Sequence, residues 1–171
     1  MKILKLNDIC KVSYDVSCVL INIKLESLFE VYPFGLLFND NDDVSNNFSK
    51  LKRNLNSIKL TKINSNNNSI FIDLNNIEEE VKKISLFINI FSLERDFFNK
   101  DKNIDKTVLK ISLCNDAEVI DELKLLRGSY NNKFNTYKLL DIYKDEGTWL
   151  ISYNLEELNT YHLELLDKLL K

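Results

Sequence analysis

Short segments in which apolar and polar residues alternate recur along this chain, and clusters of asparagine and aspartate separate them. In SCVLINIKLES (17–27), every second position holds an aliphatic residue, namely Val19, Ile21, Ile23 and Leu25. A period of two is typical of a strand with one buried face, whereas a helix repeats every 3.6 residues. The polar clusters suit turns, because asparagine and aspartate tolerate left-handed backbone angles and hydrogen-bond their own backbone. Many short strands with turns between them predict a mainly β fold, an antiparallel β-sandwich.

Several further strands are expected, over residues 3–6, 33–38, 57–63, 69–74, 81–93 and 107–115. The longest and most apolar of them, VKKISLFINIFSL (81–93), should lie centrally in its sheet. EVIDELKLL (118–126) fits a strand or a helix on its pattern alone. The run NSNNNS (64–69) is interpreted as a solvated hairpin turn.

A hairpin is expected around the only tryptophan of the chain. In LLDIYKDEGTWLISY (139–153), apolar residues lead into and out of the acidic turn Asp145-Glu146-Gly147, and Trp149 follows almost at once. Gly147 suits the left-handed position that closes a short hairpin loop. Trp149 should then pack where the returning strand meets the core.

The chain should end in an amphipathic helix over about residues 155–171. Asn154 followed by Glu157 resembles a capping box. Five leucines follow at helical spacing, Leu155, Leu158, Leu163, Leu166 and Leu169. We expect this stripe to face the core rather than a partner or a membrane. The predicted architecture is thus a β-sandwich with this C-terminal helix and short connecting helices.

Composition limits the class of protein. The 171 residues suffice for one domain with a real core, so residues 1–171 are expected to form a single domain. The net charge of −3 is spread along the chain, which argues against a nucleic-acid-binding surface. No apolar run approaches the roughly 20 residues that cross a bilayer, so direct membrane insertion is not expected. The N-terminus lacks a secretory apolar segment, and the three cysteines form no C-x-x-C pair, which favours reduced thiols in the cytoplasm.

Catalytic chemistry is not indicated. The single histidine, His162, has no cysteine or carboxylate at ligand spacing and is interpreted as a surface or boundary side chain. No nucleophile, base and orienting group can be assembled from the sequence. Neither a G-x-x-x-x-G-K nor a G-x-G-x-x-G motif is present, so nucleotide phosphate binding is not expected. The chain is therefore predicted not to be an enzyme.

Four segments, taken in order, resemble the TerD-type domain of bacterial-type tellurium-resistance and stress proteins. They are SIFIDLNNIEEEVKKISLFINIF (69–91), DFFNKDKNIDKTVLKISL (96–113), CNDAEVIDELKLL (114–126) and YKDEGTW (143–149). The resemblance runs from Ile3 to the C-terminus and is strongest from Ser69 onward. It implies a β-sandwich with short helices. It also implies a role in tellurite resistance, phage and colicin tolerance or general chemical stress, beside protein partners that are often membrane-associated.

The resemblance also raises the question of calcium, because family members carry two acidic calcium-binding segments. Calcium needs about 6–8 oxygen ligands, several of them anionic. The first family segment aligns with FEVYPFGLLF (29–38), where only Glu30 is acidic. The second aligns with the asparagine run, which offers uncharged oxygens from Asn64, Asn66, Asn67 and Asn68. No cofactor is therefore expected, and the family calcium sites should be degenerate.

A second interpretation stays open. The acidic loop NDNDD (39–43) contains Asp40, Asp42 and Asp43, which could bind calcium or another ligand together with the loop NKDKNID (99–105). The acidic loop lacks the glycine and the distant glutamate of an EF-hand, so a solvent-facing turn is preferred. The leading hypothesis is a non-enzymatic, cytoplasmic TerD-like scaffold, and the alternative is a calcium- or small-ligand-binding module.

Overall fold

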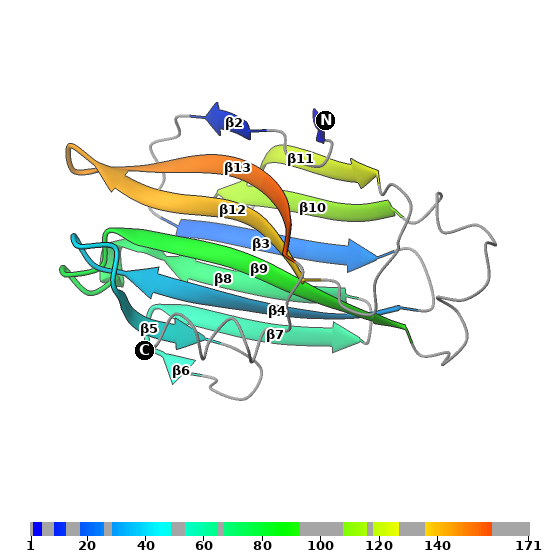
Figure 1. Ribbon diagram of the computed structural model, residues 1–171, viewed down its shortest axis with the longest axis horizontal. Helices are drawn as coiled ribbons and strands as arrows, with labels where there is room; N and C mark the ends of the chain where they lie inside the picture. The colour runs from blue at the N-terminus through cyan, green and yellow to red at the C-terminus, as the bar shows by residue number, and fades with distance from the viewer. Residues whose placement is uncertain are drawn as a thin grey trace.

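The computed structural model describes residues 2–4, 9–12, 18–25, 29–48, 54–64, 67–92, 108–115, 118–126 and 136–158. Almost all of them lie in strands, and the strands form two sheets that lie one in front of the other (Figure 1). None of the described residues belongs to a helix that is both long enough and apolar enough to cross a bilayer. The prediction of a mainly β, antiparallel fold is confirmed.

The rear layer in Figure 1 is a seven-stranded sheet of order β1-β11-β10-β3-β8-β7-β6. All pairings are antiparallel except that of β1 with β11. The bounds are β1 (Lys2–Leu4), β3 (Cys18–Leu25), β6 (Asn54–Leu55), β7 (Ile58–Asn64), β8 (Asn67–Asp73), β10 (Val108–Asn115) and β11 (Glu118–Leu126). The segment 118–126, whose sequence pattern fits either a strand or a helix, is a strand.

The front layer is a six-stranded antiparallel sheet of order β2-β13-β12-β9-β4-β5. Its strands are β2 (Ile9–Val12), β4 (Phe29–Phe38), β5 (Val44–Phe48), β9 (Lys83–Ser92), β12 (Thr136–Asp145) and β13 (Thr148–Leu158). Strand β9 lies between β4 and β12, so the expectation that its apolar segment is central is confirmed. A short 3₁₀ turn, η1 (Leu74–Asn76), precedes β9.

The main core draws side chains from both layers. Ile21 and Ile70 of the seven-stranded sheet and Leu86 of the six-stranded sheet are fully buried in one cluster. The alternation of side chains explains why these residues are buried, since every second residue of β3, β8 and β9 points to the same side of its sheet. Trp149, 8% exposed, also belongs to this cluster, so the prediction that it packs against the core is confirmed.

A second, smaller cluster lies on the opposite side of the six-stranded sheet. It is formed by Phe34, Leu36, Phe38 and Phe87, with Val44 and Leu158 packed against it. Phe34 and Phe87 come from adjacent strands, and their rings stack with centroids 5.0 Å apart. In β9, Leu86 therefore faces the main core while the next residue, Phe87, faces away from it. The outer face of the six-stranded sheet therefore carries an apolar cluster of its own.

Two predictions about segment limits were wrong. The C-terminal helix was expected to begin near Leu155, but β13 continues to Leu158 and pairs with β12 up to Thr136. Hydrogen bonding to β12 therefore overrides the capping pattern of Asn154 and Glu157, and the remainder of the predicted helix lies outside the described residues. The hairpin predicted at 64–69 does join β7 to β8, but the strands extend farther into this run than expected, because Asn64 ends β7 and pairs with Asn67, where β8 begins.

The β12–β13 hairpin has a two-residue turn. Asp145 pairs with Thr148, and the two residues between them have positive φ angles, 45° at Glu146 and 87° at Gly147. Positive φ at both positions defines a type I′ turn, which matches the twist of the flanking strands and prefers Asn-Gly. Gly147 thus takes the left-handed position that the sequence predicts.

We predict opposite effects for two substitutions in this turn. Glu146→Asn should raise the free energy of unfolding by a few tenths of a kcal/mol, because asparagine tolerates positive φ better than glutamate. Gly147→Ala should lower it by about 1–2 kcal/mol through backbone strain alone, since an added Cβ would meet no atom within 4 Å. Urea unfolding of both variants measures the difference, and an unchanged stability of Gly147→Ala would contradict this turn geometry.

A second prediction concerns Gly35 and its cross-strand partner Phe48. An added Cβ at Gly35 would lie 2.2 Å from Cε1 of the Phe48 ring, so Gly35→Ala should destabilise the fold by about 1–3 kcal/mol through overpacking. The cost should be smaller when Phe48 is already leucine, because the clashing ring atoms are gone. A double-mutant cycle by chemical denaturation tests this coupling, and additive costs would show that the two sites are independent.

Candidate functional site

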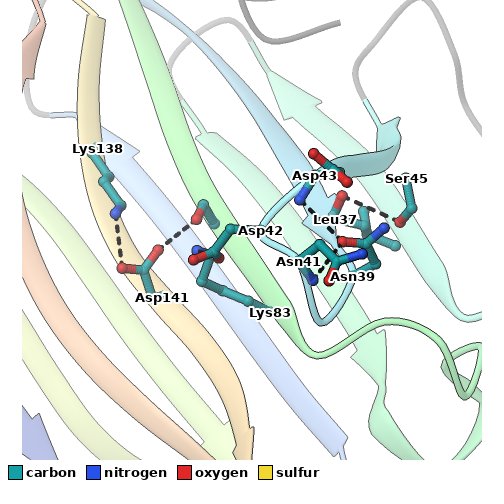
Figure 2. A network of polar contacts seen from close by, with 10 residues as sticks. Leu37, Asn39, Asn41, Asp42, Asp43, Ser45, Lys83, Lys138 and Asp141 are labelled. Atoms are coloured by element: carbon teal, nitrogen blue, oxygen red, sulfur yellow. Dashed lines mark hydrogen bonds and ion pairs between the residues drawn. The ribbon is translucent and has the colours of Figure 1, made fainter.

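The acidic loop Asn39–Asp43 joins β4 to β5 and is closed by its own first residue (Figure 2). The Asn39 Oδ1 accepts hydrogen bonds from the backbone N–H groups of Asn41, at 2.9 Å, and Asp43, at 3.0 Å. The backbone of the loop is also closed, because Asn39 N donates to Asp43 O at 3.0 Å and Asp42 N donates to Asn39 O at 3.2 Å. The amide oxygen of Asn39 is therefore engaged in holding the turn.

Asp42, with a φ of 60°, directs its carboxylate toward β9, where Lys83 forms an ion pair with it. The hydrogen bond and the positive charge of Lys83 lower the pKa of Asp42 below its ordinary value. The Lys83 ammonium also lies 4.4 Å from the centroid of the Phe38 ring, a cation–π distance. Lys83 thus ties the tip of the loop to the sheet.

A second polar group lies farther along the same face of the sheet (Figure 2). Ser85 Oγ donates a hydrogen bond of 2.5 Å to Asp141 Oδ1, and Lys138 Nζ lies 2.8 Å from Asp141 Oδ2. Ser85 and Asp141 are directly opposite each other on β9 and β12. Both oxygens of the Asp141 carboxylate therefore have partners within the sheet. Sequence reasoning missed this group, because the pairing depends on the register of two strands that are far apart in the chain.

Three connections meet at the end of the molecule where the acidic loop lies. Lys82, just before β9, donates its backbone N–H to Phe38 O at 2.8 Å, and Lys144 N donates to Lys82 O at 2.8 Å. The Lys144 ammonium lies 5.8 Å from the centroid of the Trp149 ring. These bonds fix the acidic loop, the segment before β9 and the β12–β13 turn next to one another.

The other candidate residues lie at the opposite end of the layers. Strand β3 ends at Leu25 and β4 begins at Phe29, so Glu30 lies at the start of β4, and Asn67 pairs with Lys24 near the end of β3. Asn64 is opposite Asn67 across the β7–β8 hairpin. The side chains of Glu30 and Asn64 lie outside the described residues, as does all of Asn66.

Of this group, Asn67 and Asn68 are the asparagines whose side chains the structure describes. Asn67 is half-buried. Asn68 is 3% exposed on the buried side of β8 and is engaged in an interaction there, so it is part of the strand packing rather than of an open loop. The structure therefore brings Glu30 and the asparagine run to one end of the fold and the acidic loop to the other.

The chemistry of the acidic loop follows from these contacts. Asp40 and Asp43 are exposed, whereas Asp42 is paired with Lys83 and the Asn39 oxygen already accepts two donors. Within the part of the chain that the structure describes, no three His, Cys, Asp or Glu side chains are grouped as a metal ion would require. The loop has the contacts of a self-closed turn that is fastened to the sheet.

The self-closed turn makes a prediction about Asn39. Asn39→Ala removes the acceptor of two backbone amides and should lower the free energy of unfolding by about 0.5–1.5 kcal/mol, the usual value of a hydrogen bond. Asn39→Asp keeps an acceptor oxygen in the same place and should cost less. Urea denaturation of the pair checks the assignment. Equal losses in both variants would mean that the Oδ1 contacts do not hold the loop.

Comparisons with known proteins find solved structures with a similar fold. No protein-family model matches the sequence, and no curated protein matches it. Among solved structures, the chain is similar to SAV2460, a protein of unknown function, with a TM-score of 0.68 and 10% identity over 89% of this chain and 95% of that chain. It is also similar to SCO6318 from Streptomyces coelicolor A3(2), a homologue of telluride resistance protein (TerD). That match has a TM-score of 0.64 and 7% identity, over 88% of this chain and 95% of that one.

At these identities the similarity concerns the backbone arrangement and carries no residue-level chemistry. It covers nearly the whole of both chains, so it is a similarity of complete folds rather than of one hairpin. It also agrees with the fold that the resemblance implies. The chain has a TerD-like fold.

Proposed function

We propose that this chain is a non-enzymatic, cytoplasmic stress-response protein that uses a TerD-like β-sandwich as a scaffold for protein partners. The fold supports the general class, and the sequence supplies no catalytic constellation. In this proposal the family calcium sites are degenerate and the surface carries the function. The partners we propose are other tellurium-resistance-type or membrane-associated proteins, because the resemblance implies them.

The observation that carries the proposal is the way in which the acidic loop uses its oxygens. Calcium affinity depends on several anionic oxygens that are available together. Here the carboxylate of Asp42 faces an ammonium group, and the oxygen of Asn39 accepts two backbone donors. A cation at this loop would have to displace Lys83 and to break the contacts that close the turn. The loop is better suited to present Asp40 and Asp43 to solvent.

The asparagine run supports the same conclusion at the other end. Its oxygens bring no charge to offset the dehydration of a divalent ion. Asn68 is buried and engaged within the strand layer, and Asn67 is paired with Lys24 of β3 in the sheet register. We therefore expect little calcium affinity at this position.

Thermal unfolding with and without millimolar calcium tests this expectation, and we predict no shift of the melting temperature beyond that with magnesium. A specific site at about 100 times its dissociation constant would add about 2.7 kcal/mol of stability. A domain of this size gains about 2–4 °C for each kcal/mol, so such a site would raise the melting temperature by several degrees.

A calcium-specific shift would favour the alternative, a calcium- or small-ligand-binding module. The variant Asp40→Asn/Asp42→Asn/Asp43→Asn then locates the site. Loss of the shift in this variant would assign it to the acidic loop, and a retained shift would assign it to the end that contains Glu30. The stress role itself is tested by growth under tellurite with and without expression of the chain. Equal growth in both strains would count against that role.

A further inference from the structure

The outer face of the seven-stranded sheet is open where its side chains are described. Phe71 of β8 is 40% exposed, and Lys59 and Lys24, on the strands to either side, are exposed as well. Phe71 alternates with Ile70 and Ile72, which are fully buried in the main core, so it points to the other side of the sheet. This part of the face is therefore accessible to a partner.

The strand register places three lysines in one row across this face. Lys24 of β3 is directly opposite Lys110 of β10, and Lys110 is directly opposite Lys124 of β11. Directly opposite residues lie on the same face of a sheet, so the row belongs to the face on which Lys24 is exposed. Like charges in such positions destabilise a sheet. The lysine row therefore costs stability unless an anionic group offsets it.

The carboxylates that share this face within the described strands are fewer than the lysines. By register, Glu122 lies in the row next to the lysines, opposite Ser112, and Asp73 lies at the far end of β8. The carboxylate of Asp73 already accepts hydrogen bonds from Asn75 N at 3.2 Å and from Asn76 Nδ2 at 2.8 Å. Because Lys59 adds a further ammonium group, the face is basic although the chain as a whole is acidic.

Carboxylates gather at the opposite end of the molecule, which we call the acidic end. It consists of the segments 39–43, 78–83 and 144–146, which meet because Lys82 N donates to Phe38 O and Lys144 N donates to Lys82 O (Figure 1). The three segments contain eight carboxylates, all on exposed residues, and three lysines, a net charge of −5. The whole chain has −3, so its remaining residues carry +2. Charges that are dispersed in the sequence are thus collected at one end of the fold.

We propose that copies of this chain associate head to tail, with the acidic end of one copy docked on the lysine row of the next. The two surfaces lie apart within one copy. Strand β3 begins at Cys18, opposite Asp73 and close to the segment 78–83, and Lys24 lies about 20 Å farther along the strand. A head-to-tail contact leaves one surface of each kind free, so it can extend beyond two copies.

Charge complementarity selects a second copy as the occupant of the face. An exposed ion pair contributes little by itself, so the contact needs several pairs at once and weakens with salt. The lysine row offers its ammonium groups in one line, and the acidic end offers carboxylates from three adjacent segments. Docking also places negative groups beside lysines that repel one another in the free molecule.

Sedimentation velocity of the full-length chain tests the proposal at ionic strengths of about 0.01 M and about 1 M, where the Debye lengths are about 30 Å and 3 Å. A chelator is present throughout, so that calcium plays no part. We expect the average mass to rise with protein concentration at low salt and to remain that of the monomer at high salt. A chain that is monomeric in both buffers would overturn the proposal.

Two neutralising variants locate the surfaces. Lys24→Gln/Lys110→Gln removes two charges from the lysine row, and Glu78→Gln/Glu80→Gln removes two from the acidic end. Each variant alone should associate about tenfold more weakly than the unmodified chain, because two ion pairs are lost. A mixture of the two should form dimers and nothing longer, since one intact acidic end then meets one intact lysine row.

Lys144→Gln and Glu156→Gln are the matched controls, because they remove an exposed lysine from the acidic end and an exposed carboxylate from β13. Neither substitution should weaken the association. If either double variant associates as strongly as the unmodified chain, another surface makes the contact and the proposal is wrong. A monomer that instead binds a short single-stranded RNA through the same lysines would assign the face to nucleic acid, which also overturns it.

The lysine variant has a second readout that a loss of structure would not give. Removing like charges from directly opposite positions should raise its urea midpoint while its association falls. A lower midpoint would contradict the repulsion within the row on which the proposal depends. These measurements involve neither calcium nor a stress function, so this proposal and the proposed function fail separately.

Discussion

The structure depends on burial of strand β9 from both sides. Leu86 and its alternate neighbours Ile84 and Ile88 face the core between the layers, while Phe87 lies in the cluster on the opposite face. A strand with two buried faces needs the near-continuous apolar run that this segment has. Burying a large apolar side chain contributes about 1.5–3 kcal/mol, so loss of either layer would cost much of the stability of a typical domain.

Much of this fold could be predicted from local patterns. Alternation identified most of the strands, and the left-handed position of Gly147 in the hairpin before Trp149 was also predicted, whereas the type I′ geometry of that turn came from the structure. The errors occurred where pairing with a strand distant in the sequence determines the secondary structure. The segment 154–158 has a capping pattern, yet its backbone bonds to β12, and this tertiary contact overrides the local helix signal.

The candidate site was less predictable for the same reason. The acidic loop was visible in the sequence, but its ion pair with Lys83 joins residues 41 positions apart, and the pair of Ser85 with Asp141 spans 56. Such partners are set by strand register, which no short window of sequence contains. The register changes the interpretation of the loop, because a carboxylate that resembles a calcium ligand in the sequence is already paired with a lysine. The same contacts fasten the acidic loop to the six-stranded sheet.

The central claim is that the six-stranded sheet has a covering layer on each face, and nuclear Overhauser contacts in the full-length protein test it most directly. We predict contacts from the Leu86 methyl groups to side chains of the seven-stranded sheet. We also predict contacts from the Phe87 ring to side chains that lie outside the six-stranded sheet, because that ring is 5% exposed. A Phe87 ring that contacts only its own sheet and water would contradict the account.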